Sequence, residues 1–151
     1  MINEIKHLFP NADPLVDFEL RDNSDGKGPF IARWDAVKLG AQPTAAQLSA
    51  VTVVADIAAF KTPALNAFRA TREQMFSRIA GMGFAALQKG DTVTAAALAV
   101  FRDGIRDLPQ HPSTVAATTP VELKTAMTLR YKELTDALPL SVKAAFQALD
   151  K

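Results

Sequence analysis

The spacing of hydrophobic and polar positions changes twice along the chain, and each change predicts a different kind of element. In the first 14 residues, Ile2, Ile5 and Leu8 suit one weak helical turn, which Pro10 and Pro14 would stop. We therefore expect a short leader arm, without a signal peptide, ahead of the first strand.

An alternating pattern follows the leader and predicts a β-hairpin. Val16, Phe18 and Leu20 are separated by charged residues, which is the two-residue period of a half-buried strand. Turn-forming residues fill positions 22–28, and the apolar segment 29–34 would return as the second strand. A two-stranded hairpin is barely stable alone, so we expect it to pack against another part of the chain.

After residue 43 the apolar residues recur at helical spacing, and capping signals divide them into helices. Thr44 with Gln47 forms a capping-box pattern, and Thr62 before Pro63 looks like a second helix start. A third capping pattern begins at Thr119. The predicted helices cover residues 44–60, 62–87, 93–108, 119–138 and 142–149, with a loop over 109–118.

This pattern predicts a mainly α protein, a helical bundle of about four to five helices with a small N-terminal β-hairpin. We place an arm and hairpin in residues 1–42 and the bundle in residues 43–151. Gly81 and Gly83 fall inside the second predicted helix, where each costs about 1 kcal/mol relative to Ala. A close helix contact or a bend would explain both glycines without a ligand.

Composition narrows the classes of function. The 151 residues include 17 basic and 16 acidic side chains, so no positive excess points to nucleic acid or to an anionic membrane. The absence of cysteine removes disulfides, thiolate metal sites and thiol nucleophiles. The apolar stretch 51–60 is broken by Asp56 and is too short for a bilayer, so we expect core helices and no membrane insertion.

Metal sites find little support in the sequence. His7 and His111 have no second ligand at the spacing of a zinc motif. Residues 22–26, Asp-Asn-Ser-Asp-Gly, resemble a calcium loop, but their oxygen ligands do not alternate and the Glu at the twelfth position is missing. The same residue types suit a hairpin turn, which we prefer. We expect no metal and no cofactor.

No catalytic constellation emerges either. Ser113 lies close to His111 in sequence, but a nucleophile also needs a group that orients its base, and no nucleophile-elbow pattern surrounds it. Asp103 and Asp107 are one helical turn apart with arginines between them, which is typical of an ion-paired helix surface. We therefore predict no catalytic residue.

The only tryptophan, Trp34, stands in the second predicted strand. It would be either a core anchor that joins the hairpin to the bundle or an anchor for a partner protein. The exposed edge of the hairpin could also pair with a neighbouring strand. The candidate partner-binding residues are Phe18, Phe30, Ile31, Arg33 and Trp34.

Two stretches carry a resemblance to a known group of proteins. Residues 28–34, GPFIARW, followed by residues 42–48, QPTAAQL, resemble the N-terminal segment of small tail-region proteins of tailed bacteriophages. Residues 72–113 are similar to helical hairpins of phage tail and tail-fibre-associated proteins. The resemblance brings no catalytic residues. It implies a virion component or an assembly factor of the phage.

From the resemblance we expect a structural component of a phage tail, in the baseplate or at a fibre attachment, that docks to other tail proteins in several copies. It would be made in the host cytoplasm and located in the virion tail. The alternative is a tail-fibre assembly chaperone that is absent from the finished particle. A small hydrolase and a DNA-binding regulator are weaker alternatives, because the sequence offers neither a site nor a basic helix.

Overall fold

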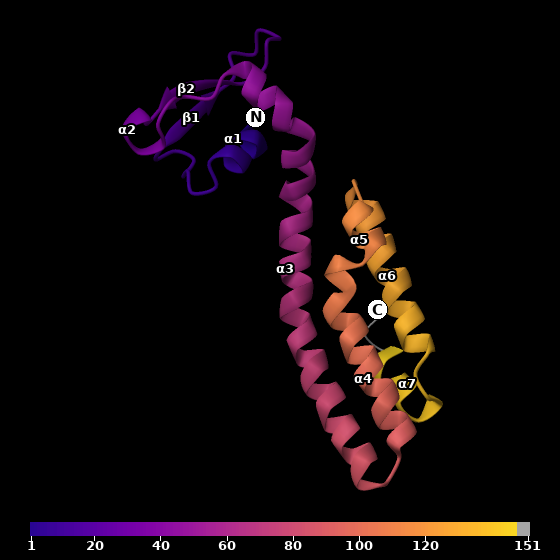
Figure 1. Cartoon of the computed structure of the whole chain (residues 1–151). Helices are drawn as coiled ribbons and strands as arrows, with labels where there is room; N and C mark the ends of the chain where they lie inside the picture. The colour runs from indigo at the N-terminus through magenta and orange to yellow at the C-terminus, as the bar shows by residue number, and fades with distance from the viewer. Residues whose placement is uncertain (148–151) are drawn as a thin grey trace. The chain divides into compact units, whose positions relative to one another are not determined.

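The computed structural model describes residues 1–147, and the chain divides into two compact units. We call Met1–Phe60 the hairpin unit and the part from Lys61 onward the helical unit. The fold is mainly α with a small N-terminal β-hairpin, which confirms the class predicted from sequence (Figure 1).

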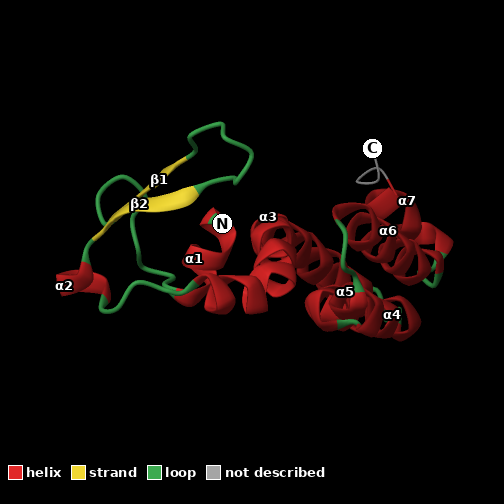
Figure 2. Cartoon of the chain, turned by 90° about the horizontal axis from the view of Figure 1, so that it is seen from above, coloured by secondary structure: helices red, strands yellow, loops and turns green. Residues whose placement is uncertain are grey.

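The hairpin unit holds the only two strands of the described chain. Its elements are α1 (Ile2–Leu8), β1 (Phe18–Arg21), β2 (Phe30–Trp34), α2 (Ala36–Leu39) and the first turns of α3 (Ala45–Gln88). The strands are antiparallel, with Phe18 opposite Trp34 and Arg21 opposite Phe30 (Figure 2). The register shifts between Glu19 and Leu20, so the ladder contains a bulge.

The hairpin turn is built as the sequence predicts. An Asp22 side-chain oxygen accepts the backbone N–H of Ser24, and an Asp25 oxygen accepts that of Lys27. Gly26 and Gly28 have φ values of 80° and 78°, in the left-handed region that favours glycine. Both hydrogen bonds join a carboxylate to the backbone N–H two residues later, which is the contact expected of a hairpin turn.

Two details of the hairpin unit differ from the prediction. Val16 lies outside β1 and is 63% exposed, so the alternating pattern overestimated the strand by two residues. The short helix α2 was not predicted. It forms because the side chain of Asp35 accepts the N–H groups of Val37 and Lys38 directly after β2.

The hairpin packs on α1 and on the first turns of α3. The buried apolar side chains at this contact are Ile5, Ala12, Phe18 and Leu48. Asn3 of α1 donates a 2.8 Å hydrogen bond to Asp56, and Thr52 donates one of 3.2 Å to Glu4. These contacts place the boundary between the compact units at residues 60 and 61, inside α3, and not at residues 42 and 43 as the sequence suggested.

The two helices predicted on either side of residue 61 are one continuous helix. α3 has 44 residues, with Pro63 inside it. Proline removes one backbone donor and crowds the preceding turn, a cost of about 3 kcal/mol. Helix propagation is cooperative, and side chains before and after Pro63 are packed, so the helix continues through the site where local rules predict a new start.

α3 is also long and apolar enough to cross a membrane, judged by length and composition only. An 18-residue window of it has a mean hydropathy of 1.4, and 11% of that window is buried. The sequence-based expectation considered only the apolar run 51–60, which Asp56 breaks and which is too short for a bilayer. A single such helix is weak evidence for a membrane span, because the mostly buried core helix of a soluble protein passes the same test.

The helical unit continues from α3 into α4 (Thr92–Asp107), a short 3-10 helix η1 (Leu108–Gln110), α5 (Pro112–Ala116), α6 (Pro120–Asp136) and α7 (Leu140–Gln147). The segment predicted as a loop, 109–118, therefore contains most of η1 and all of α5. Prolines at the first turns of these short helices suit a helix start as well as a loop. Leu149, the predicted end of the last helix, lies outside the described residues.

Aromatic side chains form the centre of the helical unit's core. Phe101 lies 4.8 Å from Phe146 and 6.2 Å from Tyr131 between ring centroids, and the Tyr131 hydroxyl donates to the Phe146 carbonyl at 2.9 Å. The buried cluster consists of Met75, Ile79, Leu98, Phe101, Ile105, Leu108, Tyr131, Leu134, Leu138, Val142 and Phe146. It joins α3, α4, α6 and α7.

The glycines that matter for packing are not the predicted ones. A Cβ added at Gly81 or Gly83 would meet no atom within 4 Å, so neither glycine serves a close helix contact. A Cβ at Gly104 would lie 2.3 Å from the Leu134 Cδ2 atom. The close approach is thus between α4 and α6.

The different surroundings of Gly83 and Gly104 predict that substitution by alanine has opposite effects on stability at these two positions. Gly83→Ala should raise the free energy of unfolding of the helical unit by about 0.5–1 kcal/mol, because it only improves helix propensity. Gly104→Ala should lower it by about 1 kcal/mol, because overpacking against Leu134 outweighs that gain. Urea unfolding followed by far-ultraviolet circular dichroism measures both. A stabilised Gly104→Ala variant would contradict the close contact.

Candidate protein-docking site

A pocket in the hairpin unit collects the residues that carry the phage-tail resemblance. Its volume is about 470 Å³. We call it the motif pocket. Its lining comes from α1, the end of the hairpin turn, β2 and the start of α3, namely Met1, Glu4, Lys27, Pro29, Phe30, Ile31, Gln42, Pro43, Ala45, Leu48, Ser49 and Thr52. Residues from both resembling stretches, 28–34 and 42–48, therefore meet at one place.

Local sequence signals hold both sides of the motif pocket. On one side the left-handed Gly28 ends the hairpin turn and leads into Pro29 and β2. On the other side, Thr44 and Gln47 form the predicted capping box, since the Gln47 side chain accepts from the Thr44 N–H at 2.8 Å and the Thr44 hydroxyl accepts from the Gln47 N–H at 3.2 Å. The pocket is thus bounded by two locally determined turns.

One charged residue of the pocket lining, Glu4, already forms an ion pair within the chain. Glu4 is 7% exposed, and one of its carboxylate oxygens lies 2.6 Å from the amino group of Met1. That hydrogen bond is the largest of the effects that hold the pKa of Glu4 below its usual value. The negative charge of Glu4 is therefore compensated within the chain.

Of the five predicted partner residues, two line the motif pocket. Phe30 is 40% exposed and Ile31 is half-buried. Phe18, in contrast, is 1% exposed and belongs to the hairpin unit's core, so within this structure it offers no surface to a partner. Its position opposite Trp34 on the inner face of the hairpin explains its burial.

Trp34 joins several segments of the hairpin unit. Its ring packs edge-on against Phe9, with centroids 5.0 Å apart, and lies 6.1 Å from Phe18. The indole N–H donates to the Gly40 carbonyl at 2.9 Å. Trp34 therefore anchors the hairpin to the leader and to the segment after α2, while the sequence hypothesis had linked it to the bundle.

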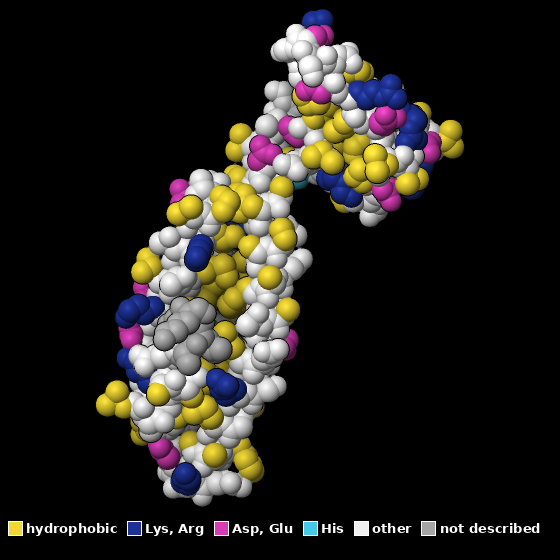
Figure 3. Space-filling view, turned by 180° about the vertical axis from the view of Figure 1, so that it is seen from behind, with side chains coloured by type: hydrophobic (Ala, Val, Ile, Leu, Met, Phe, Trp, Pro, Cys, Tyr) yellow, Lys and Arg dark blue, Asp and Glu magenta, His cyan; other side chains and the backbone are white. Residues whose placement is uncertain are grey.

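Arg33, another of the candidate partner-binding residues, holds a turn by hydrogen bonds to the backbone. Its guanidinium donates to the Val16 carbonyl at 2.7 Å and also to the Leu15 carbonyl. Leu15 has a φ of 79°, which is unusual for a residue with a side chain, and it is 82% exposed. We call residues 13–17 the Leu15 turn. Figure 3 shows that the hairpin unit carries hydrophobic surface with charged side chains around it.

An ion pair between the buried Asp17 carboxylate and the partly exposed Lys38 closes the same turn. The Asp17 carboxylate accepts the Asp13 N–H at 2.8 Å and both oxygens accept from the Lys38 ammonium, at 2.7 and 2.8 Å. The Asp17 side chain is 2% exposed. The hydrogen bond from Lys38, followed by that from the Asp13 backbone, lowers the pKa of Asp17, and the same pairing raises the pKa of Lys38.

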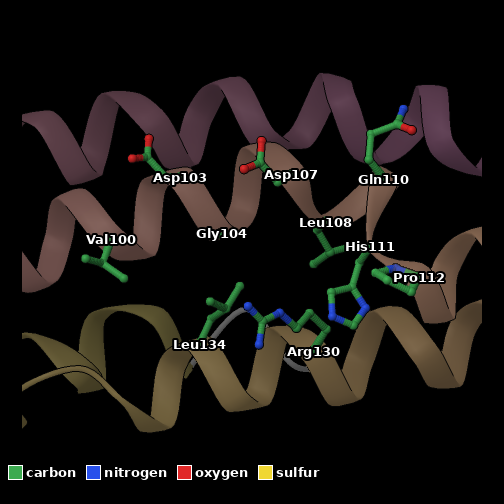
Figure 4. A pocket seen from close by; sticks show the side chains of 10 residues that line it. All are labelled: Val100, Asp103, Gly104, Asp107, Leu108, Gln110, His111, Pro112, Arg130 and Leu134. Carbon is green, nitrogen blue, oxygen red and sulfur yellow. The ribbon is translucent and has the colours of Figure 1, made fainter.

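A second cavity, also of about 470 Å³, lies between α4, η1 and α6 in the helical unit. Its lining includes His111 and Arg130, whereas the carboxylates of Asp103 and Asp107 point away from Arg130 (Figure 4). Arg106 forms ion pairs with both of these carboxylates, as predicted for an ion-paired helix surface.

The histidine and serine considered from sequence do meet. His111 Nδ1 lies 2.8 Å from the Ser113 hydroxyl oxygen. No acidic group of residues 1–147 forms a hydrogen bond with His111, so the orienting third member of a nucleophilic triad has no candidate there. Within the same part of the chain, no three His, Asp or Glu side chains gather as a metal ion requires.

Comparison with known proteins gives one finding for the hairpin unit. Residues 1–59 match the model of a family described as XkdW protein, which is phage-related. This supports a phage protein. The matched range nearly coincides with the hairpin unit, which ends at Phe60, and contains the entire lining of the motif pocket. The comparisons with curated proteins and with solved structures found no match.

The Leu15 turn was not predicted from the sequence. Leu15 follows a proline and carries no pattern of its own, and the pairing of Asp17 with Lys38 spans 21 residues. The one available signal was Asp17 itself, which lies next to the apolar Phe18. The alternating pattern assigned the Asp17 carboxylate to solvent.

Trp34→Ala tests the anchor. We expect the free energy of unfolding of the hairpin unit to fall by about 2–3 kcal/mol, because a half-buried aromatic side chain and its packing are lost. Hydrogen exchange of β1 and β2 amides measures the change, since the variant has no tryptophan. Phe30→Ala is the control and should cost less, being 40% exposed. Equal protection in Trp34→Ala and the wild type would assign Trp34 to a partner surface.

The Asp17–Lys38 pair predicts the pH dependence of the hairpin unit's stability. Because the folded pKa of Asp17 is lowered, its contribution is complete above about pH 4 and is lost as the pH falls through the folded value. Because the folded pKa of Lys38 is raised, its contribution is present below about pH 10 and is lost as the pH rises through the folded value.

Fluorescence of Trp34, the only tryptophan, follows this unit in urea titrations at each pH. The midpoint should be highest between the two limits. Asp17→Asn should have a lower midpoint at neutral pH and a smaller further loss in acid. A wild-type midpoint in Asp17→Asn would contradict the role of the pair.

Proposed function

We propose that the protein is a structural component of a phage tail, in the baseplate or at the attachment of a fibre, and that it works by protein-protein docking. The family match of residues 1–59 supports a phage protein, and the resemblance of residues 28–34 and 42–48 points to the tail region. Its partners would be other tail proteins, present in several copies.

One observation carries the docking role. Residues from both resembling stretches line one pocket, to which Pro29, Phe30, Ile31 and Leu48 contribute apolar side chains and Glu4, Lys27, Gln42, Ser49 and Thr52 contribute polar or charged ones. Apolar pockets with a few polar groups at the edge are common binding sites for other molecules. A protruding apolar side chain of a partner would bury its surface there.

The proposal is tested in purified particles of the phage that encodes the protein. Mass spectrometry should find the chain at a fixed integer ratio to the major tail proteins. Its absence from particles, together with abundant protein in the infected-cell lysate, would overturn the structural role in favour of a tail-fibre assembly chaperone.

A pocket-filling variant tests the site. Ser49 is exposed on α3 and lines the motif pocket, so Ser49→Trp should occupy the cavity without removing a core contact. We expect at least a tenfold loss of the chain from particles, since about 1.4 kcal/mol of docking energy corresponds to tenfold. Ser77→Trp, on an exposed position of α3 in the helical unit, is the matched control. Equal incorporation of both variants would remove the pocket from the docking role.

A further inference from the structure

We propose that α3 contains a hinge at Pro63, where the long helix opens into two shorter helices and closes again. We call residues 59–63 the Pro63 turn. The inference concerns a movement within α3 and goes beyond the proposed docking function. It does not depend on that function, because it is tested on the full chain alone.

The backbone of the Pro63 turn lacks a hydrogen bond that a regular helix has at each turn. In an α-helix each N–H donates to the carbonyl four residues earlier, and proline has no N–H. Pro63 therefore leaves the Ala59 carbonyl without its helical donor, and its ring crowds that same carbonyl. Since Pro63 is the one proline inside α3, the helix is weakest at this turn.

The side-chain anchors of α3 change from one compact unit to the other at the same place. Asp56 accepts a hydrogen bond of 2.8 Å from Asn3, within the hairpin unit. The Lys61 ammonium donates to the Val115 and Ala117 carbonyls at 2.7 and 2.9 Å, within the helical unit. The boundary between the units falls between these two anchors. Each part of α3 is thus held by its own unit, and helix backbone joins the two parts.

Neither buried cluster of the described residues crosses the Pro63 turn. Leu48 is the α3 residue of the hairpin unit's cluster, and Phe68 is the first α3 residue that packs against the cluster of the helical unit. Both clusters lack a side chain from the stretch between these two residues. Thr62, Pro63 and Ala64 are exposed. Packing therefore holds each arm of α3, and opening at Pro63 would uncover no side chain of either core.

The sequence of the turn also suits the opened state. Threonine is a favoured N-cap residue and proline a favoured first residue of a helix, so Thr62 and Pro63 fit the start of a new helix. In the opened state the Thr62 hydroxyl would accept the N–H of Leu65. Opening removes the crowding by the proline ring, and the cap replaces part of the backbone hydrogen bonding that is lost. The two states are therefore close in free energy.

Opening of α3 changes the direction of the hairpin unit and leaves both cores intact. Hinges consist of a few residues, often at the ends of elements, that absorb a large change of backbone angles. Thr62 and Pro63 are the residues expected to do this. The hairpin unit, which contains the motif pocket, can then turn toward a partner while other contacts hold the helical unit.

Distances between pairs of spin labels on α3 test the hinge. The chain has no cysteine, so introduced cysteines are labelled selectively. The hinge pair is Val53→Cys with Thr71→Cys, two exposed positions equally far in sequence from Thr62. Their backbones are about 27 Å apart in a straight helix and about 19 Å apart when the two arms are at right angles. The control pair, Ala67→Cys with Ala85→Cys, has the same sequence separation, is exposed and lies within the helical unit.

Double electron–electron resonance of the frozen full chain records the distribution of each distance. The control pair should give one narrow peak, whereas the distribution of the hinge pair should extend to shorter distances. Pro63→Ala restores the missing N–H and removes the ring. This substitution should narrow the hinge-pair distribution to the width of the control and leave the control pair unchanged.

A hinge-pair distribution as narrow as that of the control pair would overturn the inference. An unchanged hinge-pair distribution in Pro63→Ala would also overturn it, because the proline would then not cause the opening. All four labelled positions are exposed, so the labels should not disturb the fold, and circular dichroism checks this. These outcomes leave the proposed function separate, because incorporation into particles is measured independently.

Discussion

The hairpin unit depends on the burial of one carboxylate, that of Asp17. A buried charge is costly unless hydrogen bonds and an opposite charge compensate it, so the groups that compensate Asp17 are held in place by it. The backbone N–H of Asp13 and the ammonium of Lys38 bind its side chain, and its own carbonyl accepts the N–H of Asp35. One residue thereby joins the Leu15 turn, the start of β1 and α2.

The other features of the unit follow from this arrangement. With α2 held beside β1, the chain after β2 turns back, and Trp34 can donate to the Gly40 carbonyl while packing on Phe9. The Leu15 turn is closed from the other side by Arg33. The polar Arg33, a candidate for a partner surface, is thus used to shape the backbone, while several apolar side chains, among them Leu15, Phe30 and Val37, stay accessible.

Local rules predicted the parts of the fold whose causes are local. The capping boxes at Thr44 and Thr119 form as expected, because each needs only residues three positions apart. The same rules failed at Pro63, where the helix continues, since packing on both flanks acts over a longer range. Gly104 was overlooked because only its neighbour on α6, Leu134, gives that glycine a purpose.

The candidate site likewise has some features that the sequence predicts and others that depend on long-range contacts. Both resembling stretches contribute to one pocket, which is lined by Phe30 and Ile31 from the first stretch and by Gln42 and Pro43 from the second. The burial of Phe18 and the hydrogen bonds from Arg33 to two backbone carbonyls depend on long-range contacts. The spacing of residues in the sequence does not predict such contacts. In the helical unit, the carboxylates near the second cavity are already paired with Arg106. The motif pocket is lined by residues of both resembling stretches, and the proposed docking role is therefore assigned to the hairpin unit.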